Sequence, residues 1–297
     1  MYDVVILTES RYENPKIIDW YIQQVLTEDQ LLKSSLEKLG LKVIRKNWSS
    51  KDFNWNQARC LIFRSTWDYF NRFDEFFKWV EKTQTVTKFI NSSEIINWNI
   101  DKYYLFELHK LGINIAPTNF IRKNNCKLLS SIMEKEKWSE AVLKPTISGA
   151  ARHTYRVNIR NIDRIQKILN NLNLKEDMIV QEFLTDIMNR GEISLIMIGG
   201  EFTHAIRKIG KENDFRVQDD HGGRTEKHHA TSEEISFAKE VITACPYDPL
   251  YARVDIIYDN NGNPSLSELE LIEPELWFRN NPKSAEKLSK KILEFLN

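Results

Sequence analysis

Three acidic residues near the C-terminus have a spacing that suits metal binding. Asp255 lies in one apolar run, and Glu268 and Glu270 lie two residues apart in the next. The pair Asn261-Gly262 between the two runs is typical of a hairpin turn, which predicts neighbouring antiparallel strands. Because residues two apart on a strand point to the same face, the three carboxylates could converge on one place.

Such a cluster needs a positive partner. Carboxylates among apolar neighbours repel one another unless a cation neutralises them, and oxygen ligands favour a hard ion such as Mg²⁺, usually shared with substrate phosphates. Arg253 precedes Asp255 by two residues on the same face and would suit a phosphate beside the metal. The solvated face of an edge strand would produce the same alternation of Glu and Leu, so this interpretation stays open beside the metal site.

A second candidate element combines a lysine with a loop of small residues. Lys144 ends an expected strand, and Ser148 and Gly149 begin the loop that follows. A backbone that folds closely over phosphates, beside a positive charge, would suit a triphosphate. The loop is neither a Walker A sequence nor a GxGxxG motif, and an ordinary small-residue turn has the same composition.

A third segment could meet the base and sugar of a nucleotide. An expected strand ends at Glu182, Phe183 and Leu184, whose backbone could contact an adenine edge, and Glu192 could hold ribose hydroxyls. Taken alone, the same residues would also suit a connector with a surface glutamate.

A fourth segment, residues 205–223, concentrates positive charge in a chain that is otherwise balanced. It contains Lys208 and Arg216 and ends in two glycines. This composition fits a mobile lid over a polyphosphate, and it equally fits a solvated loop.

Apolar periodicity predicts the elements that must position these residues. Over the first hundred residues strands alternate with helices, which favours an open parallel α/β domain, and strands become more frequent beyond it. The expected strands span residues 2–7, 41–45, 60–63, 118–121, 141–144, 154–157, 178–183, 192–198, 201–207, 251–258 and 265–272. The expected helices span residues 17–39, 73–81, 101–111, 163–172 and 284–296.

The order of these segments resembles the ATP-grasp ligases, especially the RimK-type ligases and the prokaryotic glutathione synthetases. The resemblance covers residues 101–273 and implies an α/β (α+β) fold. An N-terminal open parallel α/β domain, residues 1–97, would lie on the substrate side. A two-lobed ATP-grasp domain would follow, with a small lobe at residues 98–183 and a large lobe carrying the metal site at residues 184–297.

The resemblance also implies roles for individual residues, with ATP and Mg²⁺ as cofactors. The nucleotide would be bound by Lys102, Lys144, Ser148, Gly149, Glu182, Phe183, Leu184 and Glu192. The metal ligands would be Asp255, Glu268 and Glu270. The catalytic cations would be Arg253, Lys208 and Arg216, and Arg216 would hold the acyl phosphate.

The chain departs from the family pattern at two places. Glu270 stands where the usual E-x-N motif has asparagine, and the glycine-rich loop is shortened to residues 148–151. Residues 215–218 with Gly222-Gly223 look like the FRxN…GG segment of RimK-type enzymes. A carboxylate in place of the asparagine can still bind Mg²⁺. The first departure therefore changes which residues are expected to be ligands and leaves the expected metal the same.

Residues 64–69 and 268–274 are similar to the ATP-grasp group that contains the cyclo-ligase of cycloserine biosynthesis, which closes O-ureidoserine. Arg64 follows a buried-looking strand, where an open α/β sheet presents its ligand crevice. Arg64, Asp68 and Tyr69 could therefore recognise a carboxylate and an amine. The alternative is that Trp67 and Tyr69 only pack a domain interface.

Composition limits the other classes of function. The 42 basic residues balance the 42 acidic ones, which argues against a broad nucleic-acid-binding surface. The cysteines Cys60, Cys126 and Cys245 are far apart and fit a reducing compartment. Since no apolar run is long enough to span a bilayer and the N-terminus lacks a signal peptide, we expect a cytoplasmic protein without a membrane partner. A homodimer stays open.

The sequence therefore predicts an ATP-dependent ligase for a small, amino-acid-like carboxylate. The carboxylate would be activated as an acyl phosphate and attacked by an amine or by a nucleophile in the same molecule. The alternatives are an ATP-grasp phosphotransferase, a RimK-type protein-modifying ligase and a non-enzymatic nucleotide-binding regulator. Whether Glu273 also binds metal or substrate stays open at this point.

Overall fold

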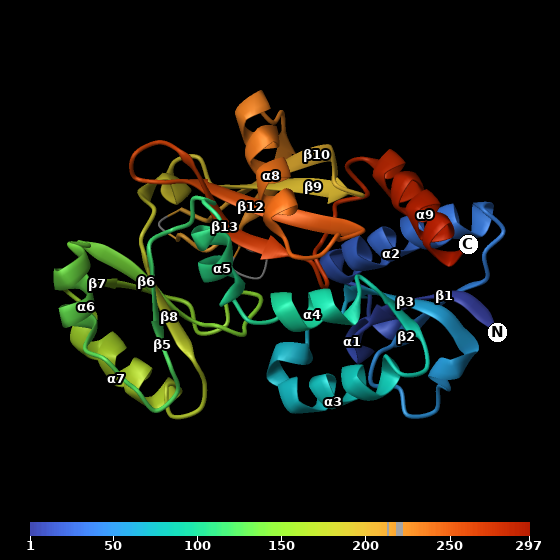
Figure 1. Cartoon of the computed structure of the whole chain (residues 1–297), viewed down its shortest axis with the longest axis horizontal. Helices are drawn as coiled ribbons and strands as arrows, with labels where there is room; N and C mark the ends of the chain where they lie inside the picture. The colour runs from blue at the N-terminus through green and yellow to red at the C-terminus, as the bar shows by residue number, and fades with distance from the viewer. Residues whose placement is uncertain (213, 218–221) are drawn as a thin grey trace.

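The computed structural model describes residues 1–212, 214–217 and 222–297, so Gln218 of the predicted lid lies outside the described residues. Its elements form three sheet-based units (Figure 1). In the view of Figure 1 the N-terminal unit lies at the right, the small lobe at the left and the large lobe above both. The α/β fold class predicted from the sequence is confirmed.

The N-terminal unit is a parallel sheet of strand order β2-β1-β3-β4. Its strands are almost wholly buried in the centre, as expected for a parallel sheet covered on both faces. The strands are β1 (Tyr2–Thr8), β2 (Val43–Asn47), β3 (Ala58–Ser65) and β4 (Lys88–Ile90). The helices are α1 (Ser10–Glu13), α2 (Trp20–Lys38), α3 (Phe73–Thr83) and α4 (Ser93–Asn99), with short 3₁₀ turns at Trp55–Gln57 and Tyr69–Asn71.

The small lobe is an antiparallel sheet of order β5-β8-β6-β7, covered by two helices on one side (Figure 1). Buried apolar residues of the strands and helices form its own core. The strands are β5 (Thr118–Ile121), β6 (Glu140–Pro145), β7 (Tyr155–Asn158) and β8 (Met178–Glu182). The helices are α6 (Leu129–Glu136) and α7 (Ile162–Leu172), while α5 (Tyr104–Lys110) leads into the lobe.

The large lobe is an antiparallel sheet with the order β11-β10-β9-β12-β13 among the described residues. The inner strands β9 and β12 are buried along their whole length, because helices or other units cover both faces. The strands are β9 (Glu192–Ile198), β10 (Glu201–Ile209), β11 (Arg224–His228), β12 (Tyr251–Tyr258) and β13 (Pro264–Glu270). The helices are α8 (Ser232–Ala244) and α9 (Pro282–Leu296), and a 3₁₀ turn, Thr185–Met188, precedes β9.

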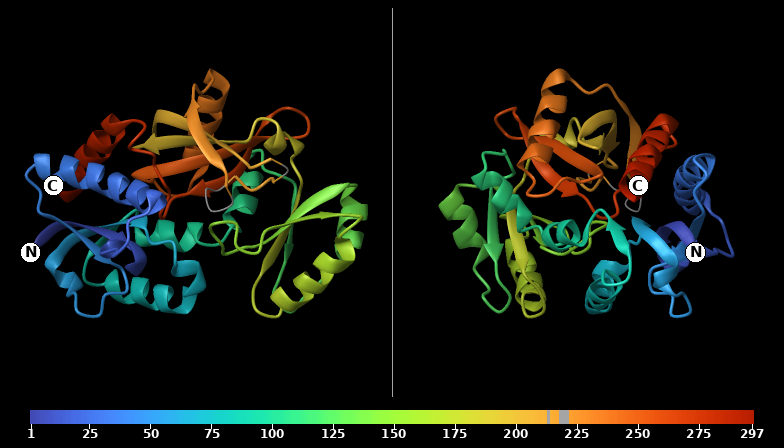
Figure 2. Two further views of the ribbon diagram at one scale, coloured as in Figure 1. Left: turned by 180° about the vertical axis from the view of Figure 1, so that it is seen from behind. Right: turned by 45° about the vertical axis from the view of Figure 1, so that its right-hand side comes forward.

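The N-terminal unit and the large lobe share one apolar core. Ile196 and Ile198 of β9 belong to the same buried cluster as Ile6 of β1 and Leu32 of α2. The C-terminal helix α9 packs against α2, and Figures 1 and 2 show the two helices side by side. The predicted boundaries at residues 97/98 and 183/184 stay predictions, but the last helix of the chain rests on the N-terminal unit.

The expected elements are all present and differ from the observed ones only at their ends. The sequence did not predict helices α1, α4, α6 and α8 or strands β4 and β11. β5, β9 and β12 have the predicted bounds. The helix expected at residue 17 begins at Trp20, because the Asp19 side chain caps it by accepting a hydrogen bond from the Ile22 amide. The helix expected from residue 101 begins only at Tyr104. No helix of the described residues is long and apolar enough to cross a membrane.

One buried side chain joins the N-terminal unit to the strands of the large lobe. The Asn91 amide donates to the carbonyls of Tyr251 (2.9 Å) and Leu271 (2.7 Å), and its oxygen accepts from the Leu250 amide (2.6 Å). Asn91 is 3% exposed, so water cannot replace these bonds.

We predict that Asn91→Ala lowers the free energy of unfolding by about 2–4 kcal/mol, because three buried backbone groups lose their partner. Urea unfolding followed by circular dichroism measures the change. The control Asn125→Ala removes an exposed turn side chain and should stay within about 0.5 kcal/mol of the parent. Equal stability of the two variants would contradict this role of Asn91.

Candidate active site

A cavity of about 650 Å³ lies where the three units meet. Its walls include residues from each unit, from Trp67 of the N-terminal unit to Lys144 of the small lobe and Asp255 of the large lobe. Of the residues predicted for the site, all but Arg64 and Tyr69 line it. The cavity therefore gathers segments that lie far apart in the sequence, from Glu9 to Trp277.

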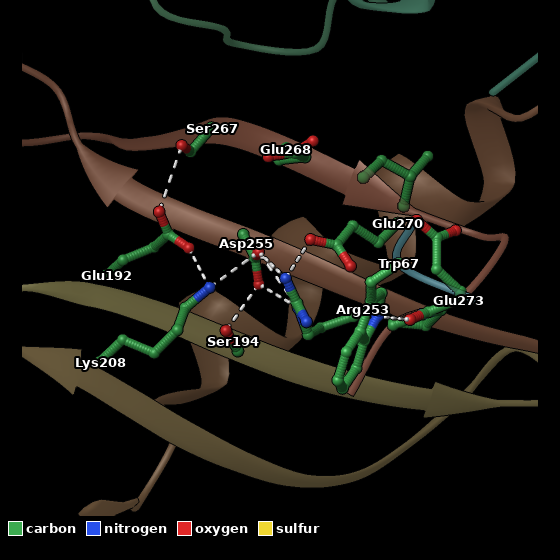
Figure 3. Close-up of polar contacts among 12 residues, drawn as sticks. Trp67, Glu192, Ser194, Lys208, Arg253, Asp255, Ser267, Glu268, Glu270 and Glu273 are labelled. Atoms are coloured by element: carbon green, nitrogen blue, oxygen red, sulfur yellow. Dashed lines mark hydrogen bonds and ion pairs between the residues drawn. The ribbon is translucent and has the colours of Figure 1, made fainter. Parts of the chain in front are cut away.

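A row of charged side chains crosses the floor of this cavity (Figure 3). Asp255 accepts hydrogen bonds from Ser194 (2.6 Å), from Lys208 (3.0 Å) and from Arg253 (2.8 Å to Nη2). Arg253 also pairs with Glu270. Lys208 pairs with Glu192 as well, which places Glu192 inside the row.

The strand register explains why these residues meet. Asp255 of β12 lies opposite Glu268 of β13, and Arg253 lies opposite Glu270, as expected for a hairpin. This confirms the antiparallel pairing predicted from Asn261-Gly262. On the other side, Asp255 lies opposite Ser194 of β9, so the charged face continues across the sheet.

The charges in the row shift one another's protonation. Burial alone would raise the pKa of Asp255, but Arg253 and Lys208 outweigh burial and hold it below its ordinary value. Burial raises the pKa of Glu270 to about 8, and the carboxylates of Glu268 and Asp255 add to the rise. The floor of the cavity thus holds more buried carboxylate than its own cations fully compensate.

This surplus of carboxylate fits a divalent cation of the Mg²⁺ type, for which oxygen donors are the usual ligands. Asp255, Glu268 and Glu270 all line the cavity from two paired strands. Among the described residues, no group of three His, Cys, Asp or Glu side chains is arranged to hold a metal ion. Glu268 forms an ion pair with Lys102, and Glu270 forms one with Arg253. The donor chemistry fits the metal, and the individual ligands stay predictions.

Two lysines approach the row from the small-lobe side. Lys102 pairs with Glu268 (2.9 Å) and donates to the Ser148 carbonyl (2.7 Å), so it ties the loop to β13. Burial lowers the pKa of Lys144 to about 8, opposed by the nearby Glu268 carboxylate. Burial would raise the pKa of Glu268, but Lys102 and Lys144 outweigh it and keep this carboxyl below its ordinary value.

The small-residue loop rests on the N-terminal unit. A Cβ at Gly149 would lie 2.8 Å from the Phe70 ring, so the loop approaches Phe70 as closely as it does only because Gly149 has no side chain. Ala150 and Ala151 have positive φ angles of 48° and 53°, a conformation that L residues seldom adopt. Residues 148–151 of this loop line the cavity, so their backbone is placed to contact phosphates bound there.

The predicted adenine hinge borders an apolar pocket. Phe183 and Leu184 cluster with Ala116, Val217 and Ile257, all buried, and this cluster lines the cavity. Flat apolar walls of this kind suit a planar base.

The hinge backbone is held from the large lobe. The side-chain amide of Asn260 donates to Glu182 (3.0 Å) and to the Phe183 carbonyl (3.1 Å). Glu192, predicted for the ribose, lies instead beside Lys208 in the charged row, so its contact with a ribose stays a prediction without support from this placement.

The basic segment, residues 205–223, contributes the buried Lys208 and the more exposed Arg216 to the cavity wall. Arg216 lines the cavity and pairs with Asp214 (2.7 Å). Its side chain is about a third exposed, in contrast to the buried Arg253 and Lys208. Arg216 is therefore placed to meet a group that enters from solvent.

The three residues predicted for the substrate have different surroundings. Arg64 is 3% exposed and donates to the Pro274 carbonyl (2.8 Å), so it packs between the N-terminal unit and the segment after β13. Tyr69 is also buried, and its hydroxyl bonds to Glu273. Asp68 does line the cavity, although it is paired with Arg72 (2.6 Å).

Several lining residues were not predicted from the sequence. They form the side of the cavity that faces the N-terminal unit, where the strand ends and the segment after β13 come together. They are Glu9, Arg11, Tyr21, Trp67 and Glu275, and beside them lies Glu273, whose role the sequence left open. The position of Glu9 directly after strand β1 was a usable signal, because ligands of parallel sheets bind at the carboxyl ends of strands.

The fold and the site define an ATP-grasp protein. Residues 105–274 match the ATP-grasp domain of the prokaryotic glutathione synthetase family, which is more than half of the chain. The chain belongs to this family. It is an ATP-dependent ligase that joins a carboxylate to an amine or another nucleophile, as predicted from the sequence.

Similarity to known proteins extends over the N-terminal unit. Residues 4–91 match the family of the D-cycloserine synthetase DcsG N-terminal domain. The cycloserine biosynthesis protein DcsG of Streptomyces lavendulae is 23% identical over 262 residues, which cover 82% of this chain and 86% of that protein.

Solved structures share the fold over the whole chain. The crystal structure of the D-cycloserine synthetase DcsG has a TM-score of 0.88 at 20% identity, covering 99% of both chains. The D-alanine–D-alanine ligase of Bacillus anthracis complexed with ATP has a TM-score of 0.69 at 12% identity, covering 100% of this chain and 97% of that one. The ATP-grasp ligase PsnB, complexed with a precursor variant, Mg and ADP, has a TM-score of 0.65 at 14% identity over the full length of both.

We predict that Asp255→Asn and Glu268→Gln each lower the rate of ADP release by about a hundredfold or more, because the charge that holds the phosphates is lost. A coupled assay for ADP measures the rate, and circular dichroism checks the fold. The control Glu226→Gln, on strand β11 of the same sheet, should keep the parent rate. Parent rates for both site variants in excess EDTA would refute the metal assignment.

Proposed function

We propose that the chain activates a small, amino-acid-like carboxylate as an acyl phosphate at the charged row. One observation carries the proposal. The buried Arg253 and Lys208 bracket Asp255 within a cavity that also contains an apolar, base-sized pocket and two lysines from the small lobe. This arrangement supports phosphoryl transfer, which needs charge neutralisation and alignment more than covalent help.

In the proposed reaction, a substrate carboxylate oxygen attacks the γ-phosphorus of ATP, and the bond to the bridging oxygen breaks to release ADP. Lys102 and Lys144 would bind the phosphates, and Arg253 and Lys208 would balance the charge of the transferred group. When bound by Asp255, Glu268 and Glu270, Mg²⁺ would neutralise the phosphate oxygens.

In the second step a nucleophile attacks the carbonyl carbon of the acyl phosphate and phosphate leaves, while the nucleophile loses a proton. Arg216 would hold the intermediate, since its side chain is about a third exposed and lines the same cavity as the buried Arg253. Water must stay out during this step, because the acyl phosphate hydrolyses.

The match of residues 4–91 to the N-terminal domain family of D-cycloserine synthetase favours a particular form of this reaction. In that form the nucleophile belongs to the same molecule as the carboxylate, and the product is a ring. A phosphotransferase that stops at a phosphate ester and a ligase for protein tails are the remaining alternatives.

We predict that the chain forms a hydroxamate when it is supplied with ATP, Mg²⁺, an amino-acid substrate and hydroxylamine. An acyl phosphate is an electrophile, so hydroxylamine should intercept it, and the iron–hydroxamate colour measures the product. The control lacks ATP and should give no colour. A stable phosphate ester with no hydroxamate would show a kinase and remove the ligase mechanism.

A further inference from the structure

The side of the cavity that faces the N-terminal unit is rich in carboxylates. We call it the acceptor pocket, lined by Glu9, Tyr21, Trp67, Asp68, Glu273 and Glu275. It adjoins the charged row, because Glu273 follows β13 only three residues after Glu270 (Figure 3). A molecule in the acceptor pocket can therefore reach the groups proposed to transfer the phosphoryl group.

Three of the four acidic residues in this pocket form an ion pair with an arginine. Glu9 pairs with Arg11, and Asp68 pairs with Arg72 (2.6 Å). Glu275 pairs with Arg279. Arg72 also pairs with Glu75, and Arg279 also pairs with Glu28, but each of these three carboxylates has an arginine within ion-pair distance.

Glu273 is different. Its carboxylate is bonded to the Tyr69 hydroxyl, and among the described residues no basic side chain forms an ion pair with it. Burial raises the pKa of Glu273 to about 7, and the opposing effects of the Tyr69 hydroxyl and of the Lys102 charge are too small to offset it. A partly buried carboxylate that has no ion-pair partner and faces a cavity is suited to bind a cationic group of a ligand.

Aromatic residues complete the pocket. The indole N–H of Trp67 donates to the backbone carbonyl of Glu273 (3.0 Å), which fixes the two residues relative to each other. The rings of Trp67 and Tyr21 lie 6.4 Å apart between centroids, and both line the cavity. A carboxylate flanked by aromatic rings is suited to an organic cation, since ring faces attract positive charge.

We propose that Glu273 binds an ammonium-type cationic group of the substrate whose carboxylate is activated at the charged row. This assignment rests on the proposed function and names the substrate class, a zwitterion that carries both groups. Lys208, Arg253 and the metal would attract the carboxylate end, and Glu273 would bind the cationic end. Sequence analysis assigned recognition of a carboxylate and an amine to Arg64, Asp68 and Tyr69 together, and that assignment stays a prediction beside this one. Of these three, Asp68 lines the cavity and is paired with Arg72.

The test compares free amino acids with their N-acetyl derivatives, which keep the carboxylate and lose the cation. The probes are D-serine, L-serine, D-alanine and O-ureidoserine, each with its N-acetyl form, titrated calorimetrically into the full chain with ADP and Mg²⁺. For at least one pair, the parent chain should bind the free amine about tenfold to a hundredfold more tightly, as expected for a charge-assisted hydrogen bond. Glu273→Gln should reduce this ratio to near one.

Two further variants control for structure. Glu275→Gln removes a carboxylate that lies in the same pocket but is paired with Arg279, and it should keep the parent ratio. Glu273→Asp keeps the charge and should keep a preference for the free amine. If Glu273→Gln does not fold, Glu273→Asp decides, because the proposal requires the preference to survive with the charge.

Three results would overturn the proposal: no free amine binds the parent chain, N-acetyl forms bind equally well, or Glu273→Gln leaves the ratio unchanged. The outcome is separate from that of the ligase mechanism. Binding that depends on Glu273 without any hydroxamate formation would remove the proposed reaction and leave this assignment in place. If hydroxamate forms but Glu273→Gln still prefers the free amine over its N-acetyl form, the proposed reaction stands and the assignment of Glu273 is wrong.

Discussion

The buried charge of Asp255 is the constraint on which the site depends. A carboxylate that is 1% exposed can stay ionised only where donors surround it, and here Ser194, Lys208 and Arg253 supply them. The three donors come from strands β9, β10 and β12, whose register is fixed by the hydrogen bonds of the sheet. Trp277 lies beneath Arg253, with the guanidinium carbon 5.3 Å from the ring centroid, and limits where that arginine can move. The sheet therefore delivers a preorganised charge pattern, which is what phosphoryl transfer requires.

The rest of the fold brings partners to this row from two directions. The small lobe contributes Lys102 and Lys144 together with the loop that Gly149 allows to rest against Phe70. The N-terminal unit contributes four residues of the acceptor pocket, Glu9, Tyr21, Trp67 and Asp68, and it shares an apolar core with the large lobe. One ligand site is thus built between units, where clefts commonly form.

Sequence patterns predicted those parts of the site that depend on local spacing. The turn Asn261-Gly262 fixed the pairing of β12 with β13, and so the approach of Asp255 to Glu268. Helix α8 was missed although Thr231 and Glu234 form a capping box, a signal that sequence inspection can find.

Placement that depends on tertiary packing was beyond such patterns. Arg64 follows a strand end, but only the structure shows that its guanidinium is turned to Pro274 and away from the cavity. Glu192 is close in sequence to the predicted hinge, whereas the pairing of β9 with β10 places it opposite Lys208. Glu273 belongs to the same acidic run as Glu268. Only the structure shows that, among the described residues, no basic side chain forms an ion pair with it.

The central claim is that a carboxylate oxygen of the substrate attacks ATP at the charged row, and oxygen transfer tests it most directly. An amino-acid substrate labelled with ¹⁸O in its carboxylate is turned over with ATP, and the released phosphate is examined by mass spectrometry. The account predicts that one ¹⁸O atom per turnover appears in inorganic phosphate, because the acyl phosphate carries a substrate oxygen on phosphorus. Phosphate without the label, released in step with product, would contradict it.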